Sequence, residues 1–191
     1  MQPPLLLAST SRYRAERLAC LNLVFEQVSP QMDESPLVDE APYDLALRLA
    51  KGKAWSLRSR YPNHLIIGSD QTAADDQGIL LDKPGTAERA REQLTRCSGQ
   101  TIIFYTGVAL VGLAIDAWVV TTEVVFRALT LTEIERYVAS EQPLDCAGSF
   151  KVESLGITLF NAVRSDDPNA LIGLPLISLA SKLRDAGFTL P

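Results

Sequence analysis

Leu5-Leu6-Leu7-Ala8-Ser9-Thr10-Ser11-Arg12-Tyr13-Arg14 is the stretch of sequence that decides the fold. Its four apolar residues stop at three residues with hydroxyl groups, which predicts a short buried strand followed by a polar turn. Leu18 and Leu21 then lie at helical spacing within residues 14–21. A strand, a turn and a helix in this order point backbone N–H groups over the turn, and such a turn favours anions.

The rest of the chain continues this alternation and then turns to strands. The further elements we expect are a strand at 24–28, a loop at 29–41, a helix at 42–60, a strand at 65–68, a hairpin turn at 75–78, a helix at 86–98, long strands at 101–115 and 117–129, a capped helix at 130–140, a strand at 157–163 and a helix at 175–186. Helices and strands alternate early and strands cluster in the middle, so we predict an α/β fold with a mixed central sheet.

Length and composition set the class of protein. The 191 residues suffice for one domain with a sizeable core or for two small lobes. An apolar fraction of 47% and a charged fraction of 21% are those of an ordinary globular chain. No apolar run approaches the roughly 20 residues of a membrane helix. No basic region precedes the first apolar run, so we expect a strand there rather than a signal peptide.

Charge and cysteine content limit the partners and the compartment. A net charge of −5 creates a field that repels nucleic acid and anionic membranes, so we expect neither as a partner. An anionic small substrate would then need local cations or a metal ion. The three cysteines, Cys20, Cys97 and Cys146, form no metal-binding spacing, and we expect free thiols in a reducing cytoplasm.

Four groups of residues have the chemistry of a phosphate site. Ser9, Ser11 and Arg14 combine hydroxyls, helix-start N–H groups and a guanidinium, although a helix cap beside solvated arginines explains them too. Glu34 lies in an acidic stretch that offers Mg²⁺ its preferred oxygen ligands. Alternatively, this stretch is a solvated loop without a metal ion. Asp70 follows a buried strand, where α/β proteins place catalytic groups, or begins a turn. Lys53 and Lys83 each suit one phosphate oxygen.

A fifth group lies later in the chain, in the string Cys146-Ala147-Gly148-Ser149-Phe150-Lys151-Val152-Glu153. Its small residues allow a ligand to approach the backbone, Lys151 adds a cation, and Glu153 adds an acceptor. A strand edge and a turn explain the same string without a ligand. Neither a P-loop, a GxGxxG motif nor a GxSxG motif occurs, which disfavours kinases, dinucleotide-binding enzymes and serine hydrolases.

Taken in order, these strings resemble the Maf family of nucleoside triphosphate pyrophosphatases. The strings that carry the resemblance are Leu7-Ala8-Ser9-Thr10-Ser11 with Arg14, Asp33-Glu34, Lys53-Ala54, Gly68-Ser69-Asp70-Gln71, Lys83-Pro84, Tyr105-Thr106-Gly107, Ala147-Gly148-Ser149-Phe150 and Gly173-Leu174-Pro175. Many family members have Glu immediately before the Lys-Ala pair, where this chain has Gly52.

The resemblance implies a fold and a set of roles. The fold is that of the inosine triphosphate pyrophosphatases, one domain over residues 1–191 with two lobes around a cleft. Use of Mg²⁺ or Mn²⁺, a cytoplasmic location and frequent homodimers are implied as well. Asp70 matches the family's proton acceptor and a metal ligand. The positions that match its phosphate- and metal-handling residues are Ser9, Arg14, Glu34, Lys53 and Lys83.

Within the family, the chain is most similar to the subgroup that hydrolyses 7-methyl-GTP. Tyr13, Gln71 and Glu153 stand at the three positions that separate this subgroup from the one acting on dTTP and UTP. Methylation at N7 makes guanine cationic, so the face of Tyr13 would attract it by roughly 0.5–2 kcal/mol. Glu153 would accept hydrogen bonds from the purine N1–H and exocyclic amine. Two alternatives remain at this stage, a dTTP/UTP pyrophosphatase and a nucleotide-binding regulator of cell division.

Overall fold

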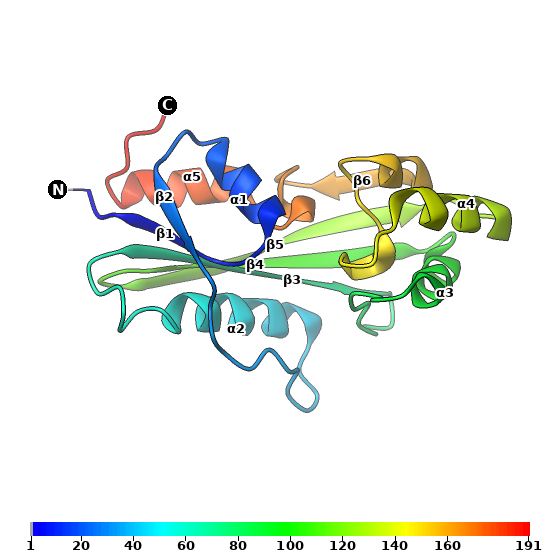
Figure 1. Cartoon of the computed structure of the whole chain (residues 1–191), viewed down its shortest axis with the longest axis horizontal. Coiled ribbons are helices and arrows are strands. Elements are labelled where there is room, and N and C mark those ends of the chain that lie inside the picture. The colour runs from blue at the N-terminus through cyan, green and yellow to red at the C-terminus, as the bar shows by residue number, and fades with distance from the viewer. Residues whose placement is uncertain (1) are drawn as a thin grey trace. The chain divides into compact units, whose positions relative to one another are not determined.

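The elements observed in the computed structural model, which describes residues 2–191, form one mixed six-stranded sheet flanked by helices (Figure 1). They are β1 (Leu5–Ala8), α1 (Arg12–Ala19), β2 (Phe25–Val28), α2 (Pro42–Trp55), β3 (Leu65–Ala74), α3 (Ala87–Cys97), β4 (Thr101–Val111), β5 (Ile115–Phe126), α4 (Leu131–Glu141), η1 (Ala147–Ser149), η2 (Leu155–Leu159), β6 (Phe160–Ser165), η3 (Ala170–Ile172) and α5 (Leu176–Asp185). The strand order is β2-β1-β3-β4-β5-β6. β1 pairs in parallel with β2 and β3, whereas β5 and β6 are antiparallel, so the predicted mixed α/β sheet is confirmed.

The chain divides into two compact units. The first unit takes in the chain up to Gln71, Thr106–Val120 and Asp166–Pro191. The second takes in Thr72–Tyr105 and Thr121–Ser165. Across residues 2–191, no helix combines the length and the apolar character that a bilayer crossing requires.

The first unit has three layers, because alternate side chains of a strand point to opposite faces. α2 covers one face of β1 and β3, and α1 and α5 cover the other (Figure 1). On the α2 face, Leu6, Ala8 and Ile66 are buried against Ala50 and Ala54. This alternation assigns the even-numbered residues of β3 to the α2 face and the odd-numbered residues to the opposite face.

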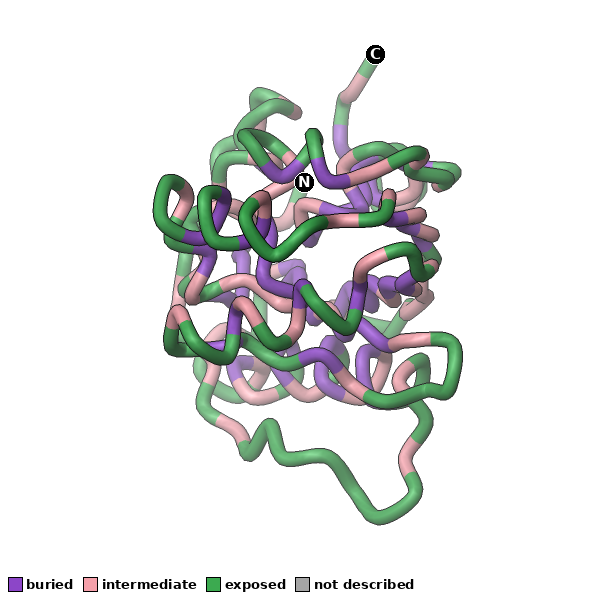
Figure 2. The backbone as a smooth tube through the Cα atoms, turned by 90° about the vertical axis from the view of Figure 1, so that its right-hand side faces the viewer, coloured by how far each residue is buried: buried purple, intermediate pink, exposed green. Residues whose placement is uncertain are grey.

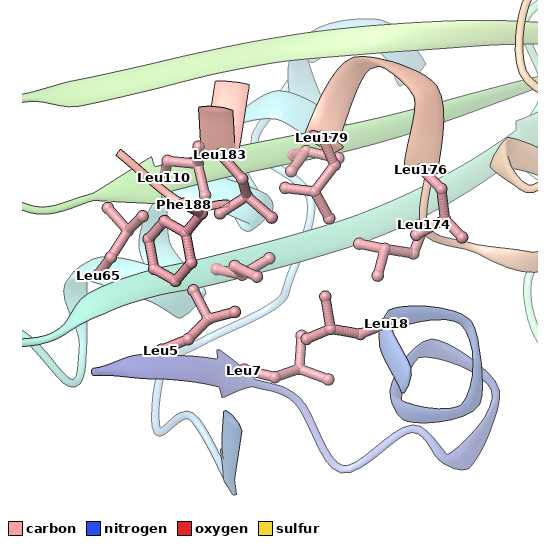
Figure 3. Close-up of a cluster of buried hydrophobic side chains, with 12 residues drawn as sticks. Leu5, Leu7, Leu18, Leu65, Leu110, Leu174, Leu176, Leu179, Leu183 and Phe188 are labelled. Atoms are coloured by element: carbon pink, nitrogen blue, oxygen red, sulfur yellow. The ribbon is translucent and has the colours of Figure 1, made fainter. Parts of the chain in front are cut away.

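The opposite face of the first unit is the larger apolar cluster. Leu5 and Leu7 of β1 point toward Leu18 of α1 and toward the leucines of α5 (Figure 3). Leu179 and Leu183 lie one helical turn apart on α5 and are both fully buried. Burial of each such side chain contributes about 1.5–3 kcal/mol relative to leaving it exposed.

The second unit is held by aromatic packing and by a well-capped helix. The rings of Phe104, Phe126, Phe150 and Phe160 make edge-to-face pairs with centroid separations of 4.8 to 5.7 Å. Thr130 and Glu133 form both hydrogen bonds of the predicted capping box at the start of α4.

Several predicted boundaries are wrong, and the error at β3 bears on the site. β3 was expected to stop at Gly68, but it runs on to Ala74 before the predicted turn, where Gly78 adopts a φ of 78°. Asp70 therefore lies inside a strand, not after one. α2 ends at Trp55, not near residue 60, and residues 155–159 form the 3₁₀ turn η2, so β6 begins only at Phe160. The loop between β2 and α2, lowest in Figure 2, is largely exposed, as expected.

Candidate functional site

Lys53 lies between two of the predicted carboxylates. Its Nζ is 2.6 Å from Oδ1 of Asp70 and 2.7 Å from Oε2 of Glu34. The side chains of Lys53 and Asp70 are 8% and 11% exposed, whereas that of Glu34 is 54% exposed. The structure thus brings together a buried ion pair and an exposed acid that shares its cation.

Local structure explains why Lys53 and Asp70 meet. Asp70 is an even-numbered residue of β3 and so points to the face that α2 covers. Gly68, two residues earlier on the same face, lets α2 approach closely, because a Cβ there would overlap the carbonyl oxygen of Ala50. Lys53 lies on the turn of α2 that follows Ala50, and its ammonium reaches Asp70 from there.

The turn after β1 forms the second part of the site. Ser11 is the N-cap of α1, and its hydroxyl accepts the backbone N–H of Arg14. The buried Ser9 accepts hydrogen bonds from the backbone N–H of Ser11, at 3.1 Å, and from Nη1 of Arg14, at 3.5 Å. Burial lowers the pKa of the Arg14 guanidinium, and the charges of Asp70 and Glu34 oppose that shift. Arg14 therefore shares the electrostatic field of the two carboxylates.

β1 is the strand whose end creates this site. β1 pairs with β3 only as far as Ala8, opposite Gly68. From Ser69 onward, β3 has no β1 residue beside it, and the turn at Ser9 follows directly. The prediction that Asp70 lies at the carboxyl end of a strand was wrong for its own strand. The site nevertheless lies at the carboxyl end of the neighbouring parallel strand, where α/β sheets bind ligands.

The odd-numbered neighbours of Asp70 hold a turn on the other face of β3. Gln71 donates from Nε2 to the carbonyl oxygens of Ala170, at 2.9 Å, and Leu171, at 3.2 Å. The Ser69 hydroxyl lies 2.9 Å from the Gly173 carbonyl oxygen and 3.0 Å from the Gly107 carbonyl oxygen, so these two acceptors share its single proton. The expected role of Gln71 in specificity therefore has to operate with its amide nitrogen already bonded to the protein.

The acidic loop that carries Glu34 is anchored at two points. Arg48 of α2 makes a two-pronged ion pair with Glu40, with Nη2 2.7 Å from Oε2, and also donates to the Ser35 carbonyl. The hydrogen bond from Arg48 lowers the pKa of the Glu40 carboxyl to about 2. The Met32 side chain covers Gly52, where an added Cβ would lie 2.5 Å from Cε of Met32. Sequence reasoning counted Glu40 only as one acid of the stretch that could bind Mg²⁺, and it assigned no role to Arg48 or Met32, because residue spacing does not indicate these contacts.

The two carboxylates fit a divalent ion that a ligand helps to hold. No group of three or more His, Cys, Asp or Glu side chains within residues 2–191 is placed to hold a metal ion. Asp70 and Glu34 do supply two hard oxygen ligands beside one ammonium. Mg²⁺ is usually bound through one or two carboxylates plus substrate phosphates, so this donor set suits it.

The remaining predicted residues are placed as follows. Tyr13 is half-buried, and the Arg12 guanidinium lies 5.4 Å from its ring centroid. In the second unit, the buried Ser149 donates to Oε1 of Gln93, and Nζ of Lys151 donates to the Glu141 carbonyl at the end of α4. Lys83 and Glu153 are exposed. Within residues 2–191, no hydrogen bond or ion pair joins these four residues of the second unit to one another.

Comparison with known proteins yields relatives along almost the whole chain. The family model described as "Maf-like protein" matches residues 4–186. The chain is 55% identical to a 7-methyl-GTP pyrophosphatase of Xanthomonas axonopodis pv. citri, over 99% of this chain and 100% of the relative. It is 49% identical to a 7-methyl-GTP pyrophosphatase of Hahella chejuensis, over 99% of this chain and 96% of the relative.

Solved structures support the fold. A HAM1 protein from Coxiella burnetii superposes with a TM-score of 0.53 at 14% identity, covering 96% of this chain and 99% of its own. The Ham1 protein of Staphylococcus aureus gives a TM-score of 0.52 at 11% identity, over 97% and 100%. At such low identity, the likeness concerns the fold alone.

Proposed function

This chain belongs to the Maf family, and we propose that it hydrolyses 7-methyl-GTP to 7-methyl-GMP and pyrophosphate. The relatives that carry the corresponding name align over nearly its full length. The structural observation that carries the proposal is the Lys53 ammonium shared by Asp70 and Glu34, whose charges also act on Arg14 after the turn at Ser9. Acidic and basic groups of this kind are what hydrolysis of a phosphoanhydride requires.

In the proposed reaction, Asp70 accepts a proton from the attacking water. The water oxygen forms a bond to the α-phosphorus, the bond from that phosphorus to the bridging oxygen breaks, and pyrophosphate leaves with the electron pair. Lys53 holds Oδ1 of Asp70, and no other side chain within residues 2–191 donates to this carboxylate. We propose that its second oxygen accepts the proton of the attacking water.

The cations of the site act on the phosphates. Arg14 offers planar N–H donors that match phosphate oxygens, and Lys53 offers a point charge. We propose that both stabilise the negative charge that develops on the leaving pyrophosphate, together with Lys83, Ser9 and Ser11 as further phosphate ligands. Asp70 and Glu34 would hold a divalent ion, which when bound polarises phosphate oxygens and offsets their charge.

We propose that Tyr13, Gln71 and Glu153 select the base. Tyr13 is half-buried and directly precedes Arg14, and an aromatic face favours the cationic N7-methylated ring over unmodified guanine. Glu153 supplies an acceptor for the purine N1–H and amine. Lys151 and Ser149 complete the proposed substrate contacts, although their side-chain donors already bond to Glu141 and Gln93.

A pyrophosphate-release assay tests the proposal. The wild-type chain is supplied with 7-methyl-GTP, GTP, dTTP or UTP at equal concentration with Mg²⁺, and 7-methyl-GTP is expected to react fastest. Asp70→Asn is expected to lower kcat by about 10²- to 10⁴-fold, which is the usual contribution of a general base. Asp76→Asn makes the same change in an exposed turn and is expected to leave kcat unaltered. A preference for dTTP or UTP, or near-normal turnover by Asp70→Asn, would overturn the assignment.

A further inference from the structure

A small turn in the first unit is held by an unusual set of polar side chains. The turn comprises η3 and Gly173, and three of its carbonyl oxygens accept side-chain hydrogen bonds. Besides Gln71 and Ser69 of β3, Thr106 of β4 donates its hydroxyl to the Ala170 carbonyl at 2.8 Å. Gln71 also lies 3.0 Å from the Thr106 hydroxyl, so the donors form one network.

The polarity of these positions departs from the rest of their sheet face. Along the same face of β3 and β4, the other inward residues are apolar, and they include Leu65, Ile67 and Val108. Ser69 and Thr106 are fully buried. Burying a hydroxyl destabilises the folded state unless the hydroxyl is hydrogen-bonded. Apolar residues at these positions would avoid that cost. The network therefore indicates a need to fix the turn itself.

The turn is connected directly to Arg14. Nε of Arg14 donates to the Gly173 carbonyl at 3.1 Å, the same oxygen that receives the Ser69 hydroxyl. Gly173 has a φ of 104°, which favours glycine, and a Cβ there would lie 3.4 Å from Nε of Arg14. A second contact, from Nη1 to Ser9, fixes the guanidinium plane. Nη2 of Arg14 has no acceptor among residues 2–191 and is free to bind a ligand oxygen.

We propose that Thr106, with Ser69 and Gln71, is a positioning residue that acts through Arg14. These side chains fix the turn, and the turn holds the Arg14 guanidinium by its Nε. Arg14 is therefore already in one rotamer when it contacts the leaving pyrophosphate. The inference rests on the proposed function. An arginine side chain loses up to about 2 kcal/mol of rotamer entropy when ordered, so holding it in advance favours the transition state.

The test uses Thr106→Val, which keeps the shape of the side chain but removes its hydroxyl, and Thr106→Ser, which keeps the hydroxyl. Each change is made in the wild-type chain and in an Arg14→Lys chain. Lysine retains a positive charge but has no Nε–H to donate to Gly173. Pyrophosphate release gives kcat and KM for the best triphosphate of the panel, and the melting temperature monitors folding.

In the wild-type background, we expect Thr106→Val to lower kcat by about 10-fold and to change KM by less than about 2-fold. We expect Thr106→Ser to stay within about 2-fold of the wild type in both constants. In the Arg14→Lys background, Thr106→Val is expected to have almost no further effect, because residues that act through one group are not additive. A role confined to stability would lower kcat equally in both backgrounds.

The inference would be overturned if Thr106→Val lowered kcat by the same factor in the two backgrounds, or if it left kcat unchanged in the wild-type background. If Thr106→Val does not fold, Ser69→Ala removes the other buried hydroxyl without adding bulk and is measured in the same two backgrounds. If the wild-type chain releases pyrophosphate from none of the triphosphates, the proposed function fails. The inference is then measured with inorganic pyrophosphate as the ligand, whose dissociation constant should rise about 10-fold in Thr106→Val only when Arg14 is present.

Discussion

Replacing Lys53 with methionine should destabilise the protein through Asp70 rather than through Glu34. Both carboxylates contact the same ammonium, but Glu34 is 54% exposed and Asp70 only 11%. An exposed ion pair contributes about 0–1 kcal/mol, because water screens it. Removing one partner of a buried pair costs about 3–5 kcal/mol, because the other charge is left without a partner. The buried contact therefore dominates.

The expected cost lies at the lower end of that range. Arg14 still attracts the Asp70 carboxylate after Lys53 is lost, and methionine retains the packing of the lysine stem. We expect Lys53→Met to lower the free energy of unfolding by about 3 kcal/mol. For a chain of this size, 1 kcal/mol shifts the melting temperature by about 2–4 °C, so the expected loss is about 6–12 °C.

A set of variants measured by urea unfolding and by thermal melting tests this reasoning. The set comprises Lys53→Met, Asp70→Asn, the double variant and Glu34→Gln. Glu34→Gln is expected to cost less than about 1 kcal/mol. Once Asp70 is neutral, Lys53→Met should cost much less than about 3 kcal/mol, because no buried carboxylate remains. Equal costs of Lys53→Met with and without the Asp70 carboxylate would refute the buried-pair argument.

Two further predictions concern the loop that carries Glu34. Gly52→Ala is expected to raise the free energy of unfolding by up to about 1 kcal/mol, since only the flexible end of Met32 must move, and to raise KM because the loop loses an anchor; a stability loss above that size in urea unfolding would contradict it. Arg48 lowers the pKa of Glu40 to about 2. The ionised Glu40 carboxylate therefore stabilises the folded protein at any pH above the ordinary glutamate pKa, and this stabilisation is lost as the pH falls toward 2. Between pH 5 and pH 2, the melting temperature of Glu40→Gln should therefore fall less than that of the wild type. If the two melting temperatures fall in parallel, the Glu40–Arg48 pair is excluded as a source of the stability lost in acid.

Local signals in the sequence were enough to predict most elements of the fold. The capping box of Thr130 and Glu133 marks the start of α4, and Gly99 adopts the positive φ of 72° expected after a helix. Prediction failed where pairing, not local preference, decides the structure. β3 continues past its apolar run because its polar residues from Ser69 onward still pair in the sheet, and no local pattern reveals that support.

The candidate site was predictable as a set of residues but not as an arrangement. Residue types and order pointed to Lys53, Asp70 and Glu34, yet only the packing of α2 on β3 explains why one ammonium contacts both acids. Gln71 was expected to contribute to specificity, and the sequence did not indicate that its amide nitrogen bonds to carbonyls about a hundred residues later in the chain. Partners so distant in sequence leave no periodic signal. Lys151 likewise closes the end of α4, a contact that composition does not indicate.

The alternation of β3 explains how one short segment serves both faces of the sheet. Asp70 points to the α2 face and meets Lys53, while Ser69 and Gln71 point to the opposite face and fix the turn that holds Arg14. Arg14 nevertheless shares the field of Asp70, because β1 ends at Ala8 and leaves this edge of β3 open to the turn that follows. A shift of β3 by one residue would exchange the two sets of side chains and separate the acid from both cations. The buried apolar residues Ile66 and Ile67, which pack on opposite faces just before the candidate site, oppose such a shift, so the hydrophobic core fixes the register on which the geometry of the proposed site depends.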